Sequence, residues 1–155
     1  MTSPMPIEIE RKFLLAGEPP SSEGVEMKQA YLCRDPERTV RVRFEGERAV
    51  LTIKGRSVGV TRPEFEYEIP VEDARELMKL SVGDVVEKKR HYHHLGRHVW
   101  EVDVFHGANA GLVVAEIELN DEHEAFEKPE WIGAEVSDDR RYSNASLSTS
   151  PYTKW

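Results

Sequence analysis

Cysteine is nearly absent from this sequence: Cys33 is the one cysteine in 155 residues, so no internal disulfide can form. A chain without a disulfide framework is typical of a reducing compartment. No apolar run approaches the about 20 residues of a membrane-spanning helix, and residues 1–6 lack the basic start and apolar core of a signal peptide. We therefore expect a cytoplasmic protein that has no membrane partner.

Positive charge is also in deficit. The chain has 21 Lys and Arg against 29 Asp and Glu, a formal net charge of −8. This balance argues against a nucleic-acid partner but leaves room for a locally basic pocket. No glycine-rich phosphate loop is present, which excludes a P-loop or Rossmann site. The length fits a single domain, 1–155, that buries about two-thirds of its unfolded surface. Nothing in the pattern indicates an oligomeric state.

Residues 7–13 alternate in the manner of a half-buried strand. Glu8, Glu10 and Lys12 share one face, and the apolar residues at 7, 9 and 13 share the other. Similar alternation predicts further strands at 27–33, 39–45, 50–54, 62–69, 85–92, 98–105 and 112–119. We expect one helix at 71–80, which has acids in its first turn. Weaker signals indicate a short helix at 122–127, a strand at 131–136 and a helical turn at 142–147.

The charges on these strands are sorted by sign. The cations are Lys12, Arg41, Arg43, Lys54, Lys88 and Arg90, and the carboxylates are Glu8, Glu10, Glu64, Glu66, Asp103, Glu116 and Glu118. Same-sign pairs two residues apart on a strand repel unless an ion of opposite charge lies between them. For residues 7–13 alone a solvated charged face is the simpler interpretation, so the hypothesis of a site depends on the whole set.

The pattern predicts a mainly β (α+β) fold. If about eight of the strands close into an antiparallel β-barrel, with a few helices packed outside, both kinds of charged pair can line its interior. Arginine forks would bind phosphate oxygens in the lumen, and carboxylates would hold a hard cation that bridges them. Residues 71–80 and the C-terminal tail would cover the outward apolar residues. Attack of water on a metal-bound phosphate chain follows as the reaction class.

Other residues are weaker candidates. Four histidines flank an expected hairpin turn, where a transition-metal site competes with the more usual exposed imidazoles: His91, His93, His94 and His98. The tryptophans fit packing better than base stacking: Trp100, Trp131 and Trp155. Cys33 lacks the His and Asn or Asp partners that would indicate a nucleophile.

The motif Glu8-x-Glu10-x-Lys12 resembles the ExExK signature of the triphosphate tunnel metalloenzymes, also called the CYTH family. The resemblance covers essentially the whole chain. Its further matches are Gln29-Ala30-Tyr31-Leu32, Arg41-x-Arg43, Thr52-Ile53-Lys54, Glu64-Phe65-Glu66-Tyr67-Glu68-Ile69, Lys88-x-Arg90, Asp103-Val104-Phe105, Glu116-Ile117-Glu118 and Arg141-Tyr142-x-Asn144. ExExK alone is a weak pattern, but with these partners in order it is specific.

The resemblance implies a closed eight-stranded antiparallel tunnel that binds a small-molecule triphosphate and uses Mg²⁺ or Mn²⁺. It implies metal binding by Glu8, Glu10, Asp103, Glu116 and Glu118, with Glu64 and Glu66 in possible support. It implies phosphate binding by Lys12, Arg41, Arg43, Lys54, Lys88 and Arg90. A pair matching Lys12 and Tyr31 is implied to assist the attacking water. By strand parity Lys89 points away from the lumen and has no role.

Short bacterial members of this family hydrolyse inorganic tripolyphosphate, so we expect a metal-dependent triphosphatase that forms pyrophosphate and phosphate. The alternatives are a nucleoside or thiamine triphosphatase, a class IV-like adenylyl cyclase, and a non-catalytic polyphosphate-binding module. Apart from Tyr31, no aromatic residue of lumen parity stands out on the cation-bearing strands, and the loop at 55–61 offers only Arg56, Ser57 and small or aliphatic residues. This favours an inorganic chain, because a nucleotide base needs stacking or edge contacts.

Overall fold

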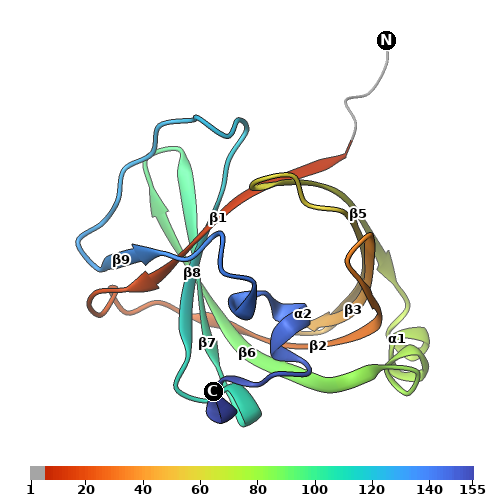
Figure 1. Cartoon of the computed structure of the whole chain (residues 1–155). Coiled ribbons are helices and arrows are strands. Elements are labelled where there is room, and N and C mark those ends of the chain that lie inside the picture. The colour runs from red at the N-terminus through yellow and green to blue at the C-terminus, as the bar shows by residue number, and fades with distance from the viewer. Residues whose placement is uncertain (1–5) are drawn as a thin grey trace.

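The computed structural model describes residues 6–155, which form nine strands, two short α-helices and three single turns of 3₁₀ helix (Figure 1). The strands are β1 (Ile7–Leu15), β2 (Gly24–Asp35), β3 (Arg38–Glu45), β4 (Arg48–Gly55), β5 (Thr61–Ile69), β6 (Val82–Leu95), β7 (His98–Phe105), β8 (Val113–Glu118) and β9 (Ile132–Glu135). The helices are α1 (Val71–Met78) and α2 (Asn144–Leu147), and the 3₁₀ turns are η1 (Gly107–Asn109), η2 (Arg140–Tyr142) and η3 (Tyr152–Lys154).

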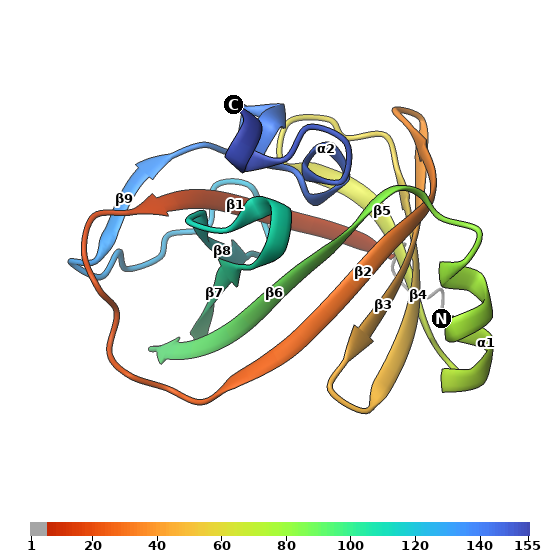
Figure 2. The same cartoon turned by 90° about the horizontal axis from the view of Figure 1, so that it is seen from below.

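The strands close into a ring in the order β5-β4-β3-β2-β6-β7-β8-β1, and a β5–β1 pairing completes it. Every pairing is antiparallel. The closed eight-stranded antiparallel barrel that the family resemblance implies is therefore confirmed. Closure requires strongly tilted strands, and the slant of β2, β3 and β6 is plain in Figure 2.

Strand β1 holds the ring together because it changes partner along one edge. Its first residues pair with β5, from Ile7 opposite Pro63 to Ile9 opposite Thr61. The rest of that edge pairs with β9, near Phe13 and Leu15. The opposite edge pairs with β8 throughout residues 10–14. The strand expected at 131–136 forms as β9. It is an additional strand that pairs with β1 beyond the residues that pair with β5.

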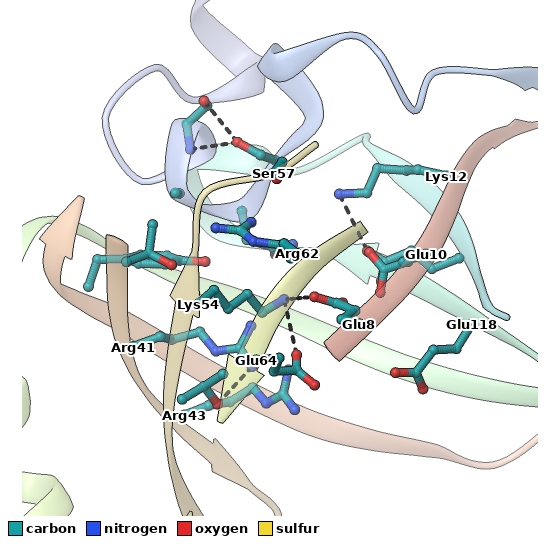
Figure 3. Close-up of a pocket in the computed structure, with 18 of the residues that line it drawn as sticks. Glu8, Glu10, Lys12, Arg41, Arg43, Lys54, Ser57, Arg62, Glu64 and Glu118 are labelled. Atoms are coloured by element: carbon teal, nitrogen blue, oxygen red, sulfur yellow. Dashed lines mark hydrogen bonds and ion pairs between the residues drawn. The ribbon is translucent and has the colours of Figure 1, made fainter. Parts of the chain in front are cut away.

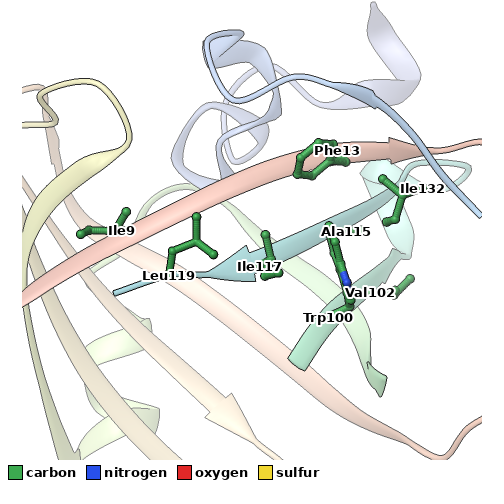
Figure 4. Close-up of a cluster of buried hydrophobic side chains, with 8 residues drawn as sticks. All are labelled: Ile9, Phe13, Trp100, Val102, Ala115, Ile117, Leu119 and Ile132. Carbon is green, nitrogen blue, oxygen red and sulfur yellow. The ribbon is translucent and has the colours of Figure 1, made fainter. Parts of the chain in front are cut away.

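The hydrophobic core lies outside the barrel wall. One cluster gathers on β1, β7, β8 and β9 around Phe13, Trp100 and Ile117 (Figure 4). A second forms where Leu147 of the C-terminal segment packs on Val86 and Phe105. These clusters bury the outward faces of the strands, so the inward faces are left to polar and charged side chains.

Helix α1 covers the third part of the wall, beside β3 and β4 (Figure 2). Its fully buried Ala74 packs against Val42 and Ala49. Pro70 precedes the helix, and Glu72 and Asp73 lie in its first turn, where the helix dipole favours acids. The predicted covers, residues 71–80 and the C-terminal tail, therefore both pack on the wall. Within residues 6–155 no helix is long and apolar enough to cross a membrane.

The short helix expected at 122–127 does not form. Asp121 accepts a hydrogen bond from the backbone N–H of His123 at 2.8 Å, which makes a turn. The side chain of Glu124 accepts the backbone N–H of Asn120 at 2.8 Å instead of continuing a helix. Pro129 then lacks the N–H that a longer helix would need. Local side-chain hydrogen bonds outweighed the weak helical pattern.

Candidate active site

A cavity of about 980 Å³ runs inside the barrel. Nearly all of the candidate site residues singled out in the sequence line it, on seven strands: Glu8, Glu10, Lys12, Tyr31, Arg41, Arg43, Lys54, Glu64, Glu66, Lys88, Arg90, Glu116 and Glu118. Figure 3 shows several of them pointing toward one another across the lumen. Asp103 is the exception, and Lys89 does not line the cavity.

The carboxylates meet because of the register between β1 and β8. Antiparallel pairing places Glu10 opposite Glu118 and Lys12 opposite Glu116, so acids from both strands share the inner face. Burial and the charges of Glu116 and Glu8 raise the pKa of Glu10 well above its usual value. The neutral form of Glu10 is therefore favoured when no cation lies among these acids.

These donors fit a hard divalent cation. They are all carboxylate oxygens, the ligands that Mg²⁺ and Mn²⁺ prefer. Among residues 6–155, no three His, Cys, Asp or Glu side chains converge closely enough to form a complete metal site by themselves. Mg²⁺ is commonly held by one or two carboxylates together with substrate phosphates. The arrangement therefore fits a cation whose coordination shell the substrate completes.

Lys54 lies between two of these acids. Its Nζ is 2.8 Å from Glu8 Oε2 and 3.4 Å from Glu64 Oε2 (Figure 3). Burial disfavours ionised Glu8, but Lys54 outweighs burial and lowers the pKa of Glu8 to about 2. Burial and the charge of Glu8 raise the pKa of Glu64 to about 7. The two acids beside one lysine thus differ in charge near neutral pH.

Lys12 is held in its charged form. Its Nζ lies 3.6 Å from Glu116 Oε1 and donates a hydrogen bond to the backbone oxygen of Tyr142 at 3.3 Å. Burial alone would lower the pKa of Lys12, but the charges of Glu116 and Glu10 outweigh burial and raise it. A lysine that accepts a proton from water must first be neutral. The resting structure therefore presents Lys12 as a cation.

Arg41 and Arg43 project from β3 into the lumen. Arg43 donates from Nε to Glu45 Oε1 at 2.8 Å, and burial together with the charges of Arg41 and Arg90 lowers the pKa of Arg43. Arg41 is 7% exposed; its Nη2 donates to the hydroxyl of Thr52, and its buried Nε has no hydrogen-bond partner in the described chain. A buried guanidinium needs a compensating anion. Arg41 is therefore a candidate residue for binding an anion.

Asp103 does not lie where a direct metal ligand would. It is 0% exposed, its carboxylate forms a bidentate pair with Arg90 at 2.7 and 2.9 Å, and Lys88 Nζ lies 2.8 Å away. Both carboxylate oxygens are thus already bonded behind the lumen. Burial lowers the pKa of Lys88 to about 8, although Asp103 opposes this. We interpret Asp103 as the residue that orients two phosphate-binding cations.

Tyr31 and Glu66 are tied to neutral partners. The hydroxyl of Tyr31 accepts a hydrogen bond from Gln29 Nε2 at 3.3 Å. Glu66 Oε2 accepts the hydroxyl of Thr52 at 3.4 Å. Thr52 therefore links Glu66 on β5 to Arg41 on β3.

The structure adds lumen residues that the sequence reasoning left out. Arg62 and Glu101 share the parity of assigned residues, so the alternation could have found them. Arg34 lines the cavity because the β2 register shifts between Tyr31 and Cys33. The segment from Ser143 to Ser146 also lines it, and Asn144 accepts Lys88 Nζ at 3.1 Å. The helical turn expected at 142–147 does form, as α2, but strand periodicity shows neither its place at the lumen nor the bulge in β2.

The expectation that Tyr31 is the one prominent aromatic of the lumen is wrong. Tyr92 and Tyr67 also line the cavity and are 39% and 55% exposed. Tyr92 follows Lys88 and Arg90 at the same parity on β6, so the alternation could have indicated it. Tyr67, by contrast, pairs with Leu51, which packs under α1, so it has the outward parity of β5.

The minor candidates fall outside the cavity. His98 pairs with Glu124, and the ring of His93 lies 5.2 Å from that of Trp131. The histidines are not gathered into a metal site within the described chain. Trp100 is a fully buried core residue. The thiol of Cys33 contacts the backbone oxygen of Arg38 at 3.7 Å.

Comparison with known proteins agrees with this architecture. The CYTH domain model matches residues 6–151. The chain therefore belongs to the CYTH family, whose triphosphate tunnel the barrel reproduces.

Particular relatives are similar over nearly their whole length. A protein of Acetivibrio thermocellus named inorganic triphosphatase is 47% identical over 148 residues, which cover 94% of this chain and 95% of that protein. A protein of the same name from Nitrosomonas europaea is 36% identical, covering 92% and 97%. The crystal structure of the inorganic triphosphatase NE1496 matches with a TM-score of 0.65 and 35% identity, covering 91% of this chain and 97% of that one.

Proposed function

We propose that this protein is a metal-dependent inorganic triphosphatase that hydrolyses tripolyphosphate to pyrophosphate and phosphate. The observation that supports this proposal most directly concerns Arg41. Its guanidinium is buried, faces a lumen of further cations and forms no ion pair in the described chain. The names of two relatives, at 47% and 36% identity, support the same reaction. A binding module without turnover would not need the full set of acids opposite those cations.

The cations would bind the phosphate chain. Arg41, Arg43 and Arg90 offer planar forks that match phosphate oxygens, and Lys54 and Lys88 add point charges. Asp103 keeps Arg90 and Lys88 in place, so little side-chain entropy is lost on binding. The buried setting strengthens each contact compared with water.

The acids would hold Mg²⁺ or Mn²⁺. Glu8, Glu10, Glu116 and Glu118 provide the oxygens, and Glu64 and Glu66 lie close enough to support them. When bound, the ion supplies charge neutralisation on the phosphate oxygens. Because its pKa is raised, Glu10 would lose a proton when it binds the ion.

Lys12 and Tyr31 would act on the reacting end of the chain. The water oxygen forms a bond to the terminal phosphorus while the bridging P–O bond breaks, and pyrophosphate leaves with the electron pair. Charged Lys12 would stabilise the negative charge on the transferring oxygens, and the hydroxyl of Tyr31 would orient the water. The loose transition state of phosphoryl transfer demands little proton removal beforehand.

Nucleoside triphosphate hydrolysis is the second candidate. The exposed ring of Tyr92, which has the lumen parity of Lys88 and Arg90, offers stacking for a base whose phosphates enter first.

We also propose a cytoplasmic location, supported by the lone free cysteine.

The test is product analysis with purified protein and tripolyphosphate in Mg²⁺ or Mn²⁺. Equal amounts of phosphate and pyrophosphate, with no product after chelation, are expected. Absence of turnover with both metals would overturn the proposal.

A further inference from the structure

Each of the three guanidinium nitrogens of Arg90 is paired with a carboxylate in the resting structure, and Nη2 also lies 3.9 Å from Glu116 Oε2. Its Nε and Nη2 donate to Asp103 at 2.7 and 2.9 Å. Its remaining nitrogen, Nη1, is paired with Glu101. A phosphate that approaches Nη1 of Arg90 therefore meets the carboxylate of Glu101 at the same nitrogen.

The two acids differ in how readily they can give way. The side chain of Asp103 is 0% exposed, is also bound to Lys88 and does not line the cavity. That of Glu101 is 19% exposed, lines the cavity, and its one ion-pair partner in the described chain is Arg90. Asp103 is fixed behind the guanidinium, whereas Glu101 lies in front of it, on the side from which substrate arrives.

The same arrangement recurs on the neighbouring cation. Arg43 donates to Glu45, whose side chain is 17% exposed against 9% for the arginine. In both pairs the carboxylate is nearer to solvent than the guanidinium and lines the same cavity. Cross-strand pairing also places Glu101 opposite Glu116, so a phosphate near the acids of β8 would lie beside Glu101.

We propose that Glu101 is an internal competitor of the phosphate group that Arg90 binds. When the phosphate chain enters, Nη1 of Arg90 transfers its hydrogen bond from Glu101 to a phosphate oxygen, while Asp103 keeps the guanidinium in place. When product leaves, Glu101 returns. This inference rests on the proposed function, because it needs an anionic substrate in the tunnel.

The competition lowers affinity for substrate and product alike. A pyrophosphate held only by strong cations would dissociate slowly, and product release limits turnover in many enzymes. An acid that replaces the product on Arg90 raises the dissociation rate at the cost of a higher KM. Glu101 is thus a positioning residue that sets residence time and takes no part in bond making.

The test compares Glu101→Gln and Glu101→Ala with Glu68→Gln. Glu68 lines the same cavity, and its substitution removes the same charge. Its ion-pair partner, however, is Arg48, whose Nε lies 3.5 Å from Glu68 Oε1. We measure KM for tripolyphosphate, kcat, and the inhibition constant of pyrophosphate with Mg²⁺. Both Glu101 variants should lower KM and the inhibition constant about tenfold, and Glu68→Gln should change them less than twofold.

A higher KM and inhibition constant in Glu101→Ala, with wild-type values in Glu101→Gln, would show instead that Glu101 merely holds Arg90 in place. That result would overturn the proposal. Unchanged constants in both variants, or equal changes in Glu68→Gln, would overturn it as well. Arg41→Ala separates this from the proposed function, because Arg41 has no contact with Glu101. Suppose that the Glu101 variants give one of these contrary results, while the wild type hydrolyses tripolyphosphate and Arg41→Ala raises KM. The role proposed for Glu101 is then wrong, and the proposed function stands.

Discussion

Arg41 lies directly opposite Thr52 across the β3–β4 pair and donates to its hydroxyl at 3.2 Å. The neighbouring lumen cations Arg43, Lys54 and Arg90 pair with carboxylates instead. The charge of Arg41 is thus left for a ligand. This contrast links the packing of the barrel wall to its use as an anion-binding tunnel.

Replacing Arg41 should therefore separate binding from folding. Arg41→Ala should reduce kcat/KM for tripolyphosphate about 10- to 100-fold, as a lost charge-assisted hydrogen bond predicts. Its melting temperature should not fall, because an uncompensated buried charge is removed. Lys89→Ala, outside the cavity, is the matched control and should leave both quantities unchanged. A destabilised Arg41→Ala of full activity would contradict this assignment.

Glu10→Gln tests the metal site. The raised pKa of Glu10 means that its charged form destabilises the metal-free fold as pH rises above the pKa of the unfolded chain. In chelator at pH 8 the variant should melt at or above the wild-type temperature. Mg²⁺ should raise the melting temperature of the wild type but not of Glu10→Gln, and turnover should be lost. An equal Mg²⁺ shift in both proteins would place the metal elsewhere.

Lys12 can be tested as a cation or as a base. Its pKa is raised by Glu116 and Glu10 despite burial, so we expect charge to be its contribution. Lys12→Arg keeps the charge but cannot accept a proton, and it should retain at least tenfold more kcat than Lys12→Ala. If both variants are equally inactive while their KM values stay near wild type, Lys12 acts as the base.

The lowered pKa of Lys88, about 8, predicts a proton linkage. Below pH 8 Lys88 is charged before the substrate binds, whereas at pH 9 it is mostly neutral and a bound anion favours its charged form. Binding of tripolyphosphate at pH 9 should therefore take up a proton. Calorimetry in two buffers of different ionisation enthalpy measures this uptake. In Lys88→Met, proton uptake on binding should no longer differ between pH 7 and pH 9. If proton uptake by the wild type does not differ between these pH values either, the linkage is refuted.

Strand alternation predicted the strands and their two faces, because one face of each strand is charged and the other apolar, whereas the closure into a barrel was implied by the family resemblance. Glu8, Arg41 and Lys88 could be assigned to the lumen from parity alone. Arg34 could not, because the bulge after Tyr31 reverses parity. Asn144 could not either, because it reaches Lys88 from a single helical turn. Parity also placed Asp103 inward but could not show that two cations enclose it.

The most direct test of the central claim is kcat/KM for tripolyphosphate, ATP and thiamine triphosphate in one preparation with Mg²⁺ and then Mn²⁺. Each reaction is repeated with chelator, and the ATP reaction is also analysed for cyclic AMP. We predict at least a tenfold preference for tripolyphosphate, no turnover in chelator and no cyclic AMP. A preference for ATP or thiamine triphosphate, cyclic AMP as the main product, or full activity in chelator would contradict the account.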